Sequence, residues 1–492
     1  MVMKKGFIIL ALACIGINVA SAQTQMRSAY FLDGYNFRHQ MNPAFAGARS
    51  YFSLPALGYT NIGISSNLGI DTFLYPTADG GLTTFMNRSV DSRTFLGKLD
   101  KNNYLSTDVS TSVFSIGAWG KRNGFTTVEC NVKANVSLNL PYDLFSFMKT
   151  IGEQQHYDIS NLGVRARTYM EWSLGHTQRV SDRLSVGGKV KILLGLASAD
   201  VRIKSLSADM NAEKWSIKAQ GDARVSAGNY LKFPTNAETG VTDAPAAGIN
   251  YDAVDFDFEN IFHNSGIGGF IGGYGVAFDL GASFEIIRGL TVSAAVLDLG
   301  FINWKASTFA TTGTNTWEFT GFEDVTLDSE SENSIGNQFS HLADGMEDLI
   351  QLQKEGVPHK FNEMLAATLN VGLEYKMPFW EGLSVGALSS TRIQGPYTWT
   401  EGRFSVNVAV GNWLSASGSY GISKFGSTFG AVLNLHCRAL NFFLGTDSLV
   451  CHYAPVAGVG SMTVNVPYRK LNVGLNFGLS FNVSKRKDKI FR

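Results

Sequence analysis

The chain has 492 residues, with 41 Lys and Arg balanced by 41 Asp and Glu, so its formal net charge at pH 7 is zero. Such a balance lacks the basic excess that nucleic-acid-binding proteins use, and no nucleic-acid partner is expected. Charged residues make up only 17% of the chain, against about 25% in an average soluble protein. A protein that turns much of its surface toward lipid needs less charge, so the composition favours a membrane barrel.

The N-terminus has the features of an export signal. Lys4 and Lys5 precede an apolar run over 6–20, and Ala20-Ser21-Ala22 offers the small residues that a signal peptidase needs. We expect cleavage near Ala22, which makes residues 1–22 a signal peptide and directs the protein to a bacterial outer membrane. The alternative is an uncleaved membrane helix, but the run is shorter than the roughly 20 apolar residues that span a bilayer.

Strict alternation of apolar residues with small or polar residues recurs along the chain, and 471–483 shows it best. One parity holds Leu471, Val473, Leu475, Phe477, Leu479, Phe481 and Val483, and the other holds Asn472, Gly474, Asn476, Gly478, Ser480 and Asn482. Successive side chains of a strand point to opposite faces, so one face is apolar and the other polar. The segment is longer than the roughly 5–6 residues of an ordinary strand and suits one that crosses a bilayer.

The same alternation places charged residues on the polar face of other predicted strands, within 184–196, 276–285, 368–375 and 403–410. In a barrel the apolar face meets lipid and the polar face lines the lumen. The expected lumen-facing residues are Lys189, Lys191, Asp279, Glu285, Glu374 and Arg403. They either pair with one another or with another part of the chain, or line a solute path. Asp298 falls on the apolar parity, a conflict that a β-bulge or a lateral opening in the wall would relieve.

Short and long connections mostly alternate, as in bacterial barrels with short periplasmic turns and long external loops. Tight turns are expected near 181–182, 288–289, 381–382, 411–412 and 436–437, and long connections near 68–106, 140–163, 197–266, 303–360 and 446–468. The short connection at Lys424-Phe425-Gly426 is an exception on the long side. The fold class is therefore all-β, a transmembrane antiparallel β-barrel over residues 50–484. We count about fourteen strands, or sixteen if a hairpin of Val201–Ala208 with Trp215–Val225 also spans. Residues 485–492 are expected to form a charged periplasmic tail.

Two long connections carry helical signals. Pro141 is expected to open a helix whose apolar residues are Leu144, Phe145, Phe147, Met148 and Ile151. A second helix is expected to contain Leu342, Met346, Leu349, Ile350 and Gln353, ending before Gly356 and Pro358. These helices either pack on the barrel rim or form an apolar capture site above the lumen.

Residues 23–49 precede the first strand and lack its alternation. They are too few to fold alone, being well below about 40 residues. They include Asn42, Pro43, Ala44, Phe45, Ala46 and Gly47 in sequence. We expect this segment to lie inside the barrel as a plug or hatch; the alternative is a disordered periplasmic lead.

The sequence contains no convincing catalytic or metal-binding pattern. Gly458-Val459-Gly460-Ser461-Met462 lacks the final glycine of the serine-hydrolase elbow. The histidines are scattered, and Cys130, Cys437 and Cys451, which remain after export, match no metal motif. We therefore expect no metal, no cofactor and no enzymatic activity.

Two stretches resemble known families. The run from Asn42 to Gly47 resembles the start of PorP/SprF-type barrels of the type IX secretion system of Bacteroidota, and the hatch of the FadL superfamily of fatty-acid transporters. The run 272–282, continued by 297–304, resembles an uncharacterised Bacteroidota family of FadL- or PorP-like outer-membrane barrels. This resemblance covers most of the mature chain and implies a plugged barrel of about fourteen strands. It transfers no catalytic residue and leaves the transported molecule open.

Two functional hypotheses follow. The first is a plugged, FadL-like channel that passes or binds a small molecule, hydrophobic in character. The alternative is a PorP/SprF-like accessory of secretion or surface assembly that acts through protein partners. The expected partners are outer-membrane lipid and lipopolysaccharide, together with a small hydrophobic ligand or secretion-system proteins. An outer-membrane enzyme would need a nucleophile or an acid–base pair at the external rim, which we do not find.

Overall fold

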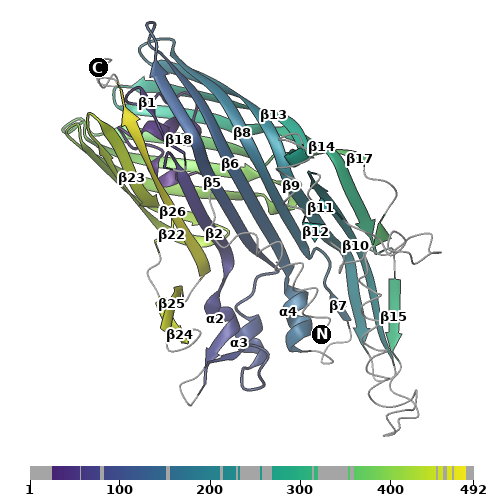
Figure 1. The fold of residues 1–492 in the computed structure, drawn as a ribbon. Helices are drawn as coiled ribbons and strands as arrows, with labels where there is room; N and C mark the ends of the chain where they lie inside the picture. Colours follow the sequence, from purple (N-terminus) through teal and green to yellow (C-terminus); the bar gives the residue numbers. More distant parts are fainter. Residues whose placement is uncertain are drawn as a thin grey trace.

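The fold is an antiparallel β-sheet that closes on itself as a barrel (Figure 1). The computed structural model describes residues 25–55, 57–77, 82–150, 156–210, 214–228, 231–232, 255–256, 269–312, 315–319, 353–354, 359–449, 453–457, 463–467 and 470–483. The predicted signal peptide and charged tail lie outside these residues. The closed wall has fourteen strands, with extra strands attached, as the sequence predicted.

The wall is built from the following strands, in which β1 with β2 and β17 with β18 each fill one position. They are β1 (Tyr51–Phe52), β2 (Thr60–Gly69), β5 (Asn102–Trp119), β6 (Gly124–Pro141), β8 (Gly163–Arg179), β9 (Leu184–Met210), β13 (Gly273–Ile287), β14 (Leu290–Thr311), β17 (His359–Met364), β18 (Ala367–Lys376), β19 (Leu383–Ile393), β20 (Trp399–Val410), β21 (Leu414–Ser423), β22 (Gly426–His436), β23 (Leu440–Thr446) and β26 (Lys470–Asn482).

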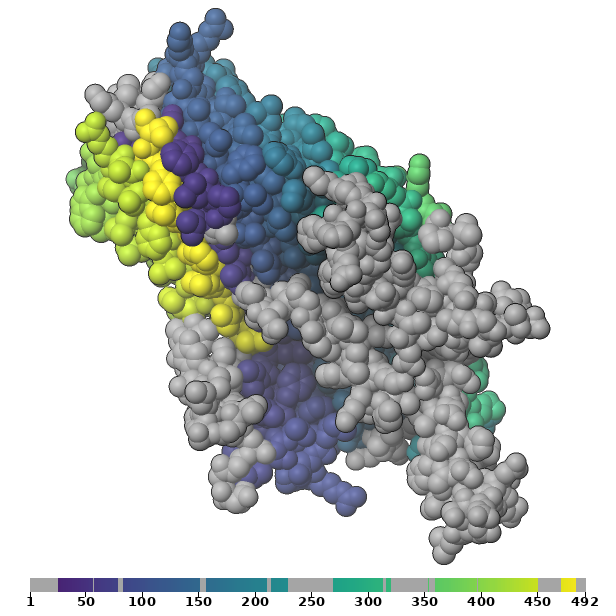
Figure 2. Space-filling view, in the orientation of Figure 1, coloured from purple at the N-terminus to yellow at the C-terminus, as the bar shows by residue number. Residues whose placement is uncertain are grey.

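The barrel closes where the last strand meets the first. β26 pairs antiparallel with β1 and β2, with Phe481 opposite Phe52 and Phe477 opposite Thr60. Figure 2 shows this seam as the yellow atoms of β26 beside the purple atoms of the first strands. A closed sheet leaves no unpaired strand edge, which is what a sheet in lipid requires.

The outer face of the wall is apolar and the inner face is polar. Leu280 and Phe404 are both 63% exposed on the outside, whereas the adjacent Asp279 and Arg403 are 1% and 2% exposed. The period-2 pattern therefore determines which side of the wall each residue faces, and the predicted barrel is confirmed.

The predicted tight turns are present, and all lie at one end of the barrel, which we call the short-turn end. They join β8 to β9, β13 to β14, β18 to β19, β20 to β21 and β22 to β23. A further turn, between β5 and β6 at residues 120–123, was not anticipated. The short connection between β21 and β22 lies at the opposite end, as expected.

Two of the predicted long connections begin later than expected, because the strands before them extend beyond the wall. β9 continues to Met210 and pairs along its extension with β10 (Trp215–Ala227). β14 continues to Thr311 and pairs with β10 as well as with β16 (Gln353–Lys354). β10 therefore pairs with both β9 and β14 beyond the first residue of β13, at the end of the barrel opposite the short-turn end, which we call the long-connection end. The hairpin of β9 and β10 consequently adds no strand to the fourteen of the closed wall.

The second predicted helix is contradicted at Gln353, which lies in the strand β16. Residues 342–350 of this predicted helix lie outside the described part of the chain.

Smaller elements lie in the lumen and at the long-connection end. They are η1 (Arg27–Ala29), η2 (Asn36–Gln40), η4 (Gly395–Tyr397), α2 (Ile70–Phe73), α3 (Ser92–Leu96), α4 (Tyr142–Lys149), β3 (Leu74–Pro76), β4 (Leu82–Thr84), β7 (His156–Asp158), β11 (Leu231–Lys232), β12 (Asp255–Phe256), β15 (Asn315–Phe319), β24 (Tyr453–Ala457) and β25 (Thr463–Pro467). Within the described residues, no helix has the length and apolar character that crossing a membrane requires.

The helix predicted after Pro141 is present as α4, at the lower end of the view in Figure 1. Phe145 is buried in a cluster with Leu68, Phe85, Val90 and Phe95, which ties α4 to the neighbouring connections. Leu144 and Phe147 pack instead against a second cluster that contains Tyr157, and only Met148 is exposed. These contacts use the apolar face for packing at the rim and do not leave it open as a capture site; Ile151 lies outside the described residues.

Candidate functional site

Residues 25–49 lie inside the barrel, against the inner face of the wall. Their aromatic and aliphatic side chains form a buried core with inward residues of the strands. The core comprises Met26, Ala29, Tyr30, Phe31, Leu32, Tyr35, Phe37, Met41, Tyr51, Tyr59, Phe125, Leu388, Val432 and Phe443. Rings such as Tyr35 and Phe443 meet edge to face, with centroids 4.9 Å apart. Burial of so much aromatic surface stabilises the segment in the lumen.

The six-residue motif makes the closest contact with the wall. The Asn42 side chain accepts from the backbone N–H of Ala44 at 2.9 Å, which closes a tight Asx turn. Its Nδ2 donates to the carbonyls of Ala282 and Ala294, each at 3.4 Å. Thr177 Oγ1 donates to the Pro43 carbonyl at 2.6 Å. The motif is thus hydrogen-bonded to three strands of the wall, β8, β13 and β14.

This contact is possible because the wall carries glycine where the motif touches it. A Cβ atom on Gly187 would lie 1.9 Å from the Pro43 carbonyl oxygen, and one on Gly281 would lie 2.1 Å from Asn42 Oδ1. No side chain fits at such distances, so these two glycines allow the close approach.

The rest of the motif turns back toward the short-turn end. The Phe45 ring meets Tyr30 edge to face at 5.2 Å, and the Arg38 guanidinium lies 4.5 Å above it. Ala46 packs beside Phe45 against the aromatic core. The Trp119 indole donates to the Gly47 carbonyl at 2.9 Å and fixes the end of the motif to β5.

The start of the segment is held by a second set of bonds around Arg403. The backbone N–H groups of Arg27 and Ser28 donate to the Asp447 carboxylate at 2.8 and 2.7 Å. Arg403 donates to Glu401 at 2.7 Å and to the Ser28 hydroxyl at 3.2 Å. The predicted lumen residue Arg403 therefore binds the N-terminal segment as well as its own strand.

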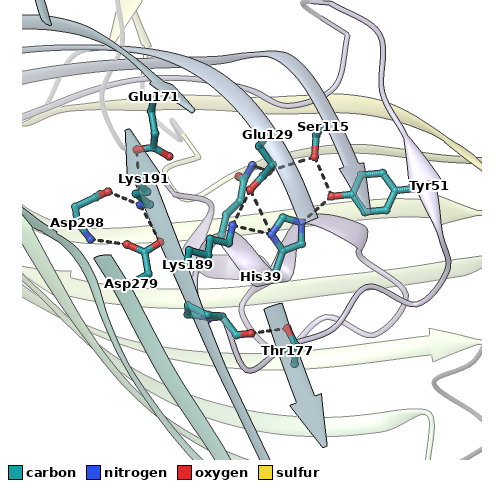
Figure 3. Close-up of polar contacts among 12 residues, drawn as sticks. His39, Tyr51, Ser115, Glu129, Glu171, Thr177, Lys189, Lys191, Asp279 and Asp298 are labelled. Atoms are coloured by element: carbon teal, nitrogen blue, oxygen red, sulfur yellow. Dashed lines mark hydrogen bonds and ion pairs between the residues drawn. The ribbon is translucent and has the colours of Figure 1, made fainter. Parts of the chain in front are cut away.

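Lys189 binds the middle of the segment in a network that we call the His39 network, which also contains Tyr51, Ser115 and Glu129 (Figure 3). Lys189 Nζ lies 2.6 Å from Glu129 Oε2 and 2.9 Å from His39 Nδ1. His39 Nε2 lies 2.7 Å from the Tyr51 hydroxyl, which is 2.9 Å from Ser115 Oγ. Ser115 Oγ donates to Glu129 at 3.2 Å and closes the ring of hydrogen bonds.

The hydrogen bonds of this network determine which ring nitrogen of His39 carries the proton. A lysine ammonium can only donate, so Nδ1 accepts from Lys189 and carries no proton. Nε2 then carries the proton and donates to Tyr51, which makes the ring neutral. Burial, and after it the positive charge of Lys189, lower the pKa of His39 from 6.5 to about 3, although Glu129 opposes this shift.

We therefore expect acid to weaken the attachment of the N-terminal segment. A histidine whose pKa is lower in the folded state contributes stability that is complete above pH 6.5 and is lost as the pH falls toward 3. The free energy of unfolding should fall by several kcal/mol across this window. The variant His39→Gln can still accept from Lys189 and donate to Tyr51. Its free energy of unfolding in urea should therefore change less between pH 7 and pH 4 than that of the unmodified protein. Equal changes in the two proteins would show that His39 does not titrate in this range.

Lys191 lies in a second buried group, the Lys191 network, which Figure 3 shows beside the first. Lys191 follows Lys189 along β9 and is therefore farther from the short-turn end. Its Nζ is 2.5 Å from Asp298 Oδ1, 2.8 Å from Asp279 Oδ2 and 3.7 Å from Glu171 Oε2. Lys133 reaches the same carboxylates, at 2.7 Å from Glu171 and 3.4 Å from Asp298. Both predicted lumen residues, Lys191 and Asp279, thus pair with other wall residues.

A β-bulge explains why Asp298 lies on the inner side despite its parity. The register between β13 and β14 shifts between Phe278 and Leu280, and Asp298 has φ of +56°. The extra residue turns the Asp298 side chain into the lumen, and its N–H donates to Asp279 at 2.7 Å. Of the two explanations that the sequence left open, the structure has the bulge.

This backbone conformation sets which substitutions Asp298 tolerates. Asparagine keeps the side-chain shape and adopts positive φ readily, so Asp298→Asn should cost at most about 1–2 kcal/mol of unfolding free energy. Asp298→Val should cost more, because a β-branched residue at positive φ adds strain of about 1–3 kcal/mol to the lost ion pairs. Urea unfolding of the two variants measures the difference; equal losses would mean that the bulge relaxes.

The two remaining predicted lumen residues lie near the short-turn end. Glu285 accepts from the backbone N–H of Gly289 at 2.8 Å and stabilises the β13–β14 turn. Glu374 is buried, but its Oε1 has no hydrogen-bond partner among the described residues. Glu374 faces a chamber that the N-terminal segment leaves open.

We call this cavity the Glu374 chamber. It has a volume of about 230 Å³ and lies between residues 31–46 and the wall. Its lining combines three aromatic rings with hydroxyl and charged groups, from Phe31, Arg38, Ala44, Phe45, Ala46, Trp119, Asn123, Thr177, Arg179, Ser185, Ser283, Thr291, Ser293 and Glu374. The chamber is mixed in character, which is typical of sites for small amphipathic molecules.

Neither network has the geometry of an enzyme nucleophile. Ser115 is bonded to Tyr51 and Glu129, not to His39, and it is fully buried. A nucleophile needs a base within hydrogen-bond reach and access for substrate. Over the described residues, no group of three or more His, Cys, Asp or Glu is placed to hold a metal ion.

Comparison with known sequences places the chain in a family. A family model matches residues 43–447. The chain belongs to DUF5723, a family of unknown function. Among curated proteins, no sequence matches this DUF5723 chain.

The chain of this DUF5723 protein is distantly similar to several solved structures. A Pseudomonas aeruginosa FadL homologue is 10% identical with a TM-score of 0.36, covering 94% of this chain and 99% of that one. The toluene transporter TbuX of Ralstonia pickettii is 9% identical with a TM-score of 0.35, covering 91% and 93%. The toluene transporter TodX of Pseudomonas putida is 9% identical with a TM-score of 0.35, covering 94% and 95%. Similarity this low carries no functional conclusion.

Proposed function

We propose that this chain is an outer-membrane channel for a small, partly apolar molecule, and that residues 23–49 are the plug that closes it. The observation that carries the proposal is the combination of a lumen filled by residues 25–49 with a chamber left beside them. The apolar outer wall supports a place in a bilayer. The hydrogen bonds from Thr177 and Asn42 hold the plug against strands that would otherwise enclose an open pore.

Ion conductance in a planar bilayer tests the proposal. The mature protein should be closed, and a variant that lacks Gln23–Arg49 should open a stable pore. If the deletion variant does not fold, the full-length variant Gly187→Val, in which the contact of the plug with β9 is blocked, provides the same test. A folded deletion variant that does not conduct would overturn the channel, because the lumen would then be closed by the wall residues alone.

A second candidate function is an accessory of secretion or surface assembly. It is favoured by the Phe95 and Phe145 cluster, which gives the connections at one end of the barrel a packed core of their own. Exposed Met86 and Met148 lie on this assembly. Isolation in mild detergent should then recover a partner in stoichiometric amount, and recovery of the chain alone would count against this function.

A further inference from the structure

We propose that three arginines at the long-connection end bind a doubly charged oxyanion, the phosphate group of a small phosphate monoester. They are Arg165, Arg202 and Arg224, which surround the carboxylate of Asp200 and which we call the arginine cluster. This inference rests on the proposed function, because it adds a charged group to the molecule that the channel would take.

The strand register brings the three arginines together on one face. β8 and β10 pair with β9 on either side (Figure 1), and Asp200 of β9 lies directly opposite Arg165 of β8 and Arg224 of β10. Arg202 is two residues farther along β9, so its side chain points to the same face. Ser198, also on this face, donates to a carboxylate of β17 at 2.8 Å. The arginine cluster therefore lies on the inner side of the sheet.

One carboxylate oxygen receives all three guanidinium groups. The Nη2 atoms of Arg202, Arg165 and Arg224 lie 2.6, 3.1 and 3.4 Å from Asp200 Oδ2. Arg202 also donates from Nε to Oδ1 of the same carboxylate at 2.8 Å. The N–H groups of three cations are thus confined to a small region, where one negative charge faces three positive charges.

The neighbouring carboxylates do not cancel this surplus, because each has a cation of its own. Asp222, which lies opposite Arg202, is 2.6 Å from Lys204. Glu363 is 3.1 Å from Arg167. With these two pairs included, five cations face three carboxylates among the described residues of this region. Two positive charges therefore remain, and a dianion would neutralise them.

The unused N–H groups of the arginine cluster can be reached by a solute. Within the part of the chain that the structure describes, Arg224 donates only through Nη2, and its Nε and Nη1 are not fully buried. The side chains of Arg224 and Arg202 are 22% and 47% exposed, whereas that of Asp200 is 4% exposed. A ligand therefore meets the guanidinium groups and not the carboxylate.

Aromatic rings hold two of the guanidinium groups in place. Arg224 lies 3.5 Å from the centroid of the Phe361 ring, and Arg165 lies 5.2 Å from that of Tyr397. Burial lowers the pKa of Arg224, the charges of Arg202 and Arg165 lower it further, and the nearby carboxylates oppose this shift only in part. An anion that binds here would relieve the repulsion among cations that are already in position.

The surplus charge and the shape of the guanidinium group together favour a phosphate. A phosphate monoester carries about 1.5 to 2 negative charges at neutral pH and offers three strong acceptor oxygens. Arginine binds such oxygens through pairs of parallel hydrogen bonds. A carboxylate carries only one charge, so it would leave part of the surplus without a partner.

Calorimetric titration of the purified barrel with phenyl phosphate, inorganic phosphate and benzoate tests this inference. At about pH 8, where both phosphates are dianions, each should bind at least about tenfold more tightly than benzoate, a difference of about 1.4 kcal/mol. Arg224→Gln and Arg202→Gln should each weaken the binding of phenyl phosphate at least about tenfold. Each variant leaves Asp200 with two arginines, so the fold should be retained.

Lys214→Gln is the matched control for these two variants. It removes one positive charge from the same hairpin, but from a lysine whose partner Glu318 is about half exposed. It should change the affinity for phenyl phosphate less than about twofold. An equal loss in the control and the arginine variants would indicate long-range attraction without a site. That result, no binding of either phosphate, or equal affinity for benzoate would overturn the inference.

A lipid headgroup could supply the same phosphate chemistry as a soluble monoester. Titration in nanodiscs that contain phosphatidate or, in its place, phosphatidylglycerol separates the two sources. We expect equal affinity for phenyl phosphate in both, because the arginine cluster lies on the inner face and lipid meets the outer face. Weaker binding in the presence of phosphatidate would overturn the assignment to a molecule that enters the lumen.

Conductance of the deletion variant gives an independent reading of the channel. Opening without phosphate binding removes the arginine site alone. Phosphate binding to a barrel that never opens removes the channel alone.

Discussion

Gly187→Val should displace the N-terminal segment from the wall and open the lumen, whereas Gly188→Val should do neither. The two glycines are neighbours on β9 and face opposite sides of the wall. A Cβ atom on Gly187 would lie 1.9 Å from the Pro43 carbonyl oxygen, but one on Gly188 has no neighbour closer than 3.6 Å. The clash involves backbone, which cannot rotate away, so the cost should reach or exceed the upper end of the about 1–3 kcal/mol that overpacking causes.

Two measurements follow the displacement. Single-channel recording should find Gly188→Val closed, like the unmodified protein, and Gly187→Val conducting. Limited trypsin digestion should cut Gly187→Val after Arg38 or Arg49, which are shielded while the segment is seated. The opposite outcome is a Gly187→Val protein that folds, does not conduct ions and resists trypsin. It would mean that the N-terminal segment shifts without leaving the lumen, and that its contact with β9 does not control the pore.

Lys189→Met should be among the most destabilising single substitutions in the described part of the chain. It leaves Glu129 buried at 1% exposure without its cation, and removing one partner of a buried pair costs about 3–5 kcal/mol. It also removes the donor to His39 Nδ1, which is 2.9 Å away. We expect both the barrel and the seating of the N-terminal segment to weaken.

A double-mutant cycle isolates the pair from the packing around it. Lys189→Met with Glu129→Leu should recover most of the stability lost by either single change, because no unpaired charge remains. Lys204→Met is the matched control, since its partner Asp222 and Lys204 itself are about half exposed, and such a pair contributes only about 0–1 kcal/mol. Urea unfolding measures the four proteins of the cycle, including the unmodified one, and the Lys204→Met control. Additive losses in the cycle would show that Lys189 and Glu129 do not stabilise each other.

The barrel could be predicted from sequence because a strand in a bilayer wall has a period of two. That pattern alone places Lys189, Lys191 and Arg403 on the inner face. The same period in 124–141 and 163–179 puts Glu129, Lys133 and Glu171 on the inner parity of β6 and β8. A signal for these three partners is therefore present in the sequence, although they are absent from the lumen residues predicted above.

Other features of the site have no local signal. The N-terminal segment consists of short 3-10 turns without periodicity, so nothing in its sequence indicates that His39 meets Lys189 or that Ser28 meets Asp447. The Asp298 side chain points inward because β14 contains one extra residue at this point. The parity of the sequence alone cannot show whether such a residue forms a β-bulge or a lateral opening in the wall. The extension of β9 beyond the wall depends on a partner, β10, that lies outside the closed sheet.

The seam between the first and last strands has a consequence for how the molecule assembles. Asn36, in the N-terminal segment, donates to Ser480 and Asn482 in β26, more than 400 residues later in the chain. Contacts of such sequence separation form slowly, because the whole intervening chain must first be confined. The segment that is synthesised first can thus gain these bonds only when the strand that is synthesised last is in place. Threading of the lumen and closure of the wall are therefore coupled, and a chain truncated before β26 would present two open strand edges with its N-terminal segment only partly held.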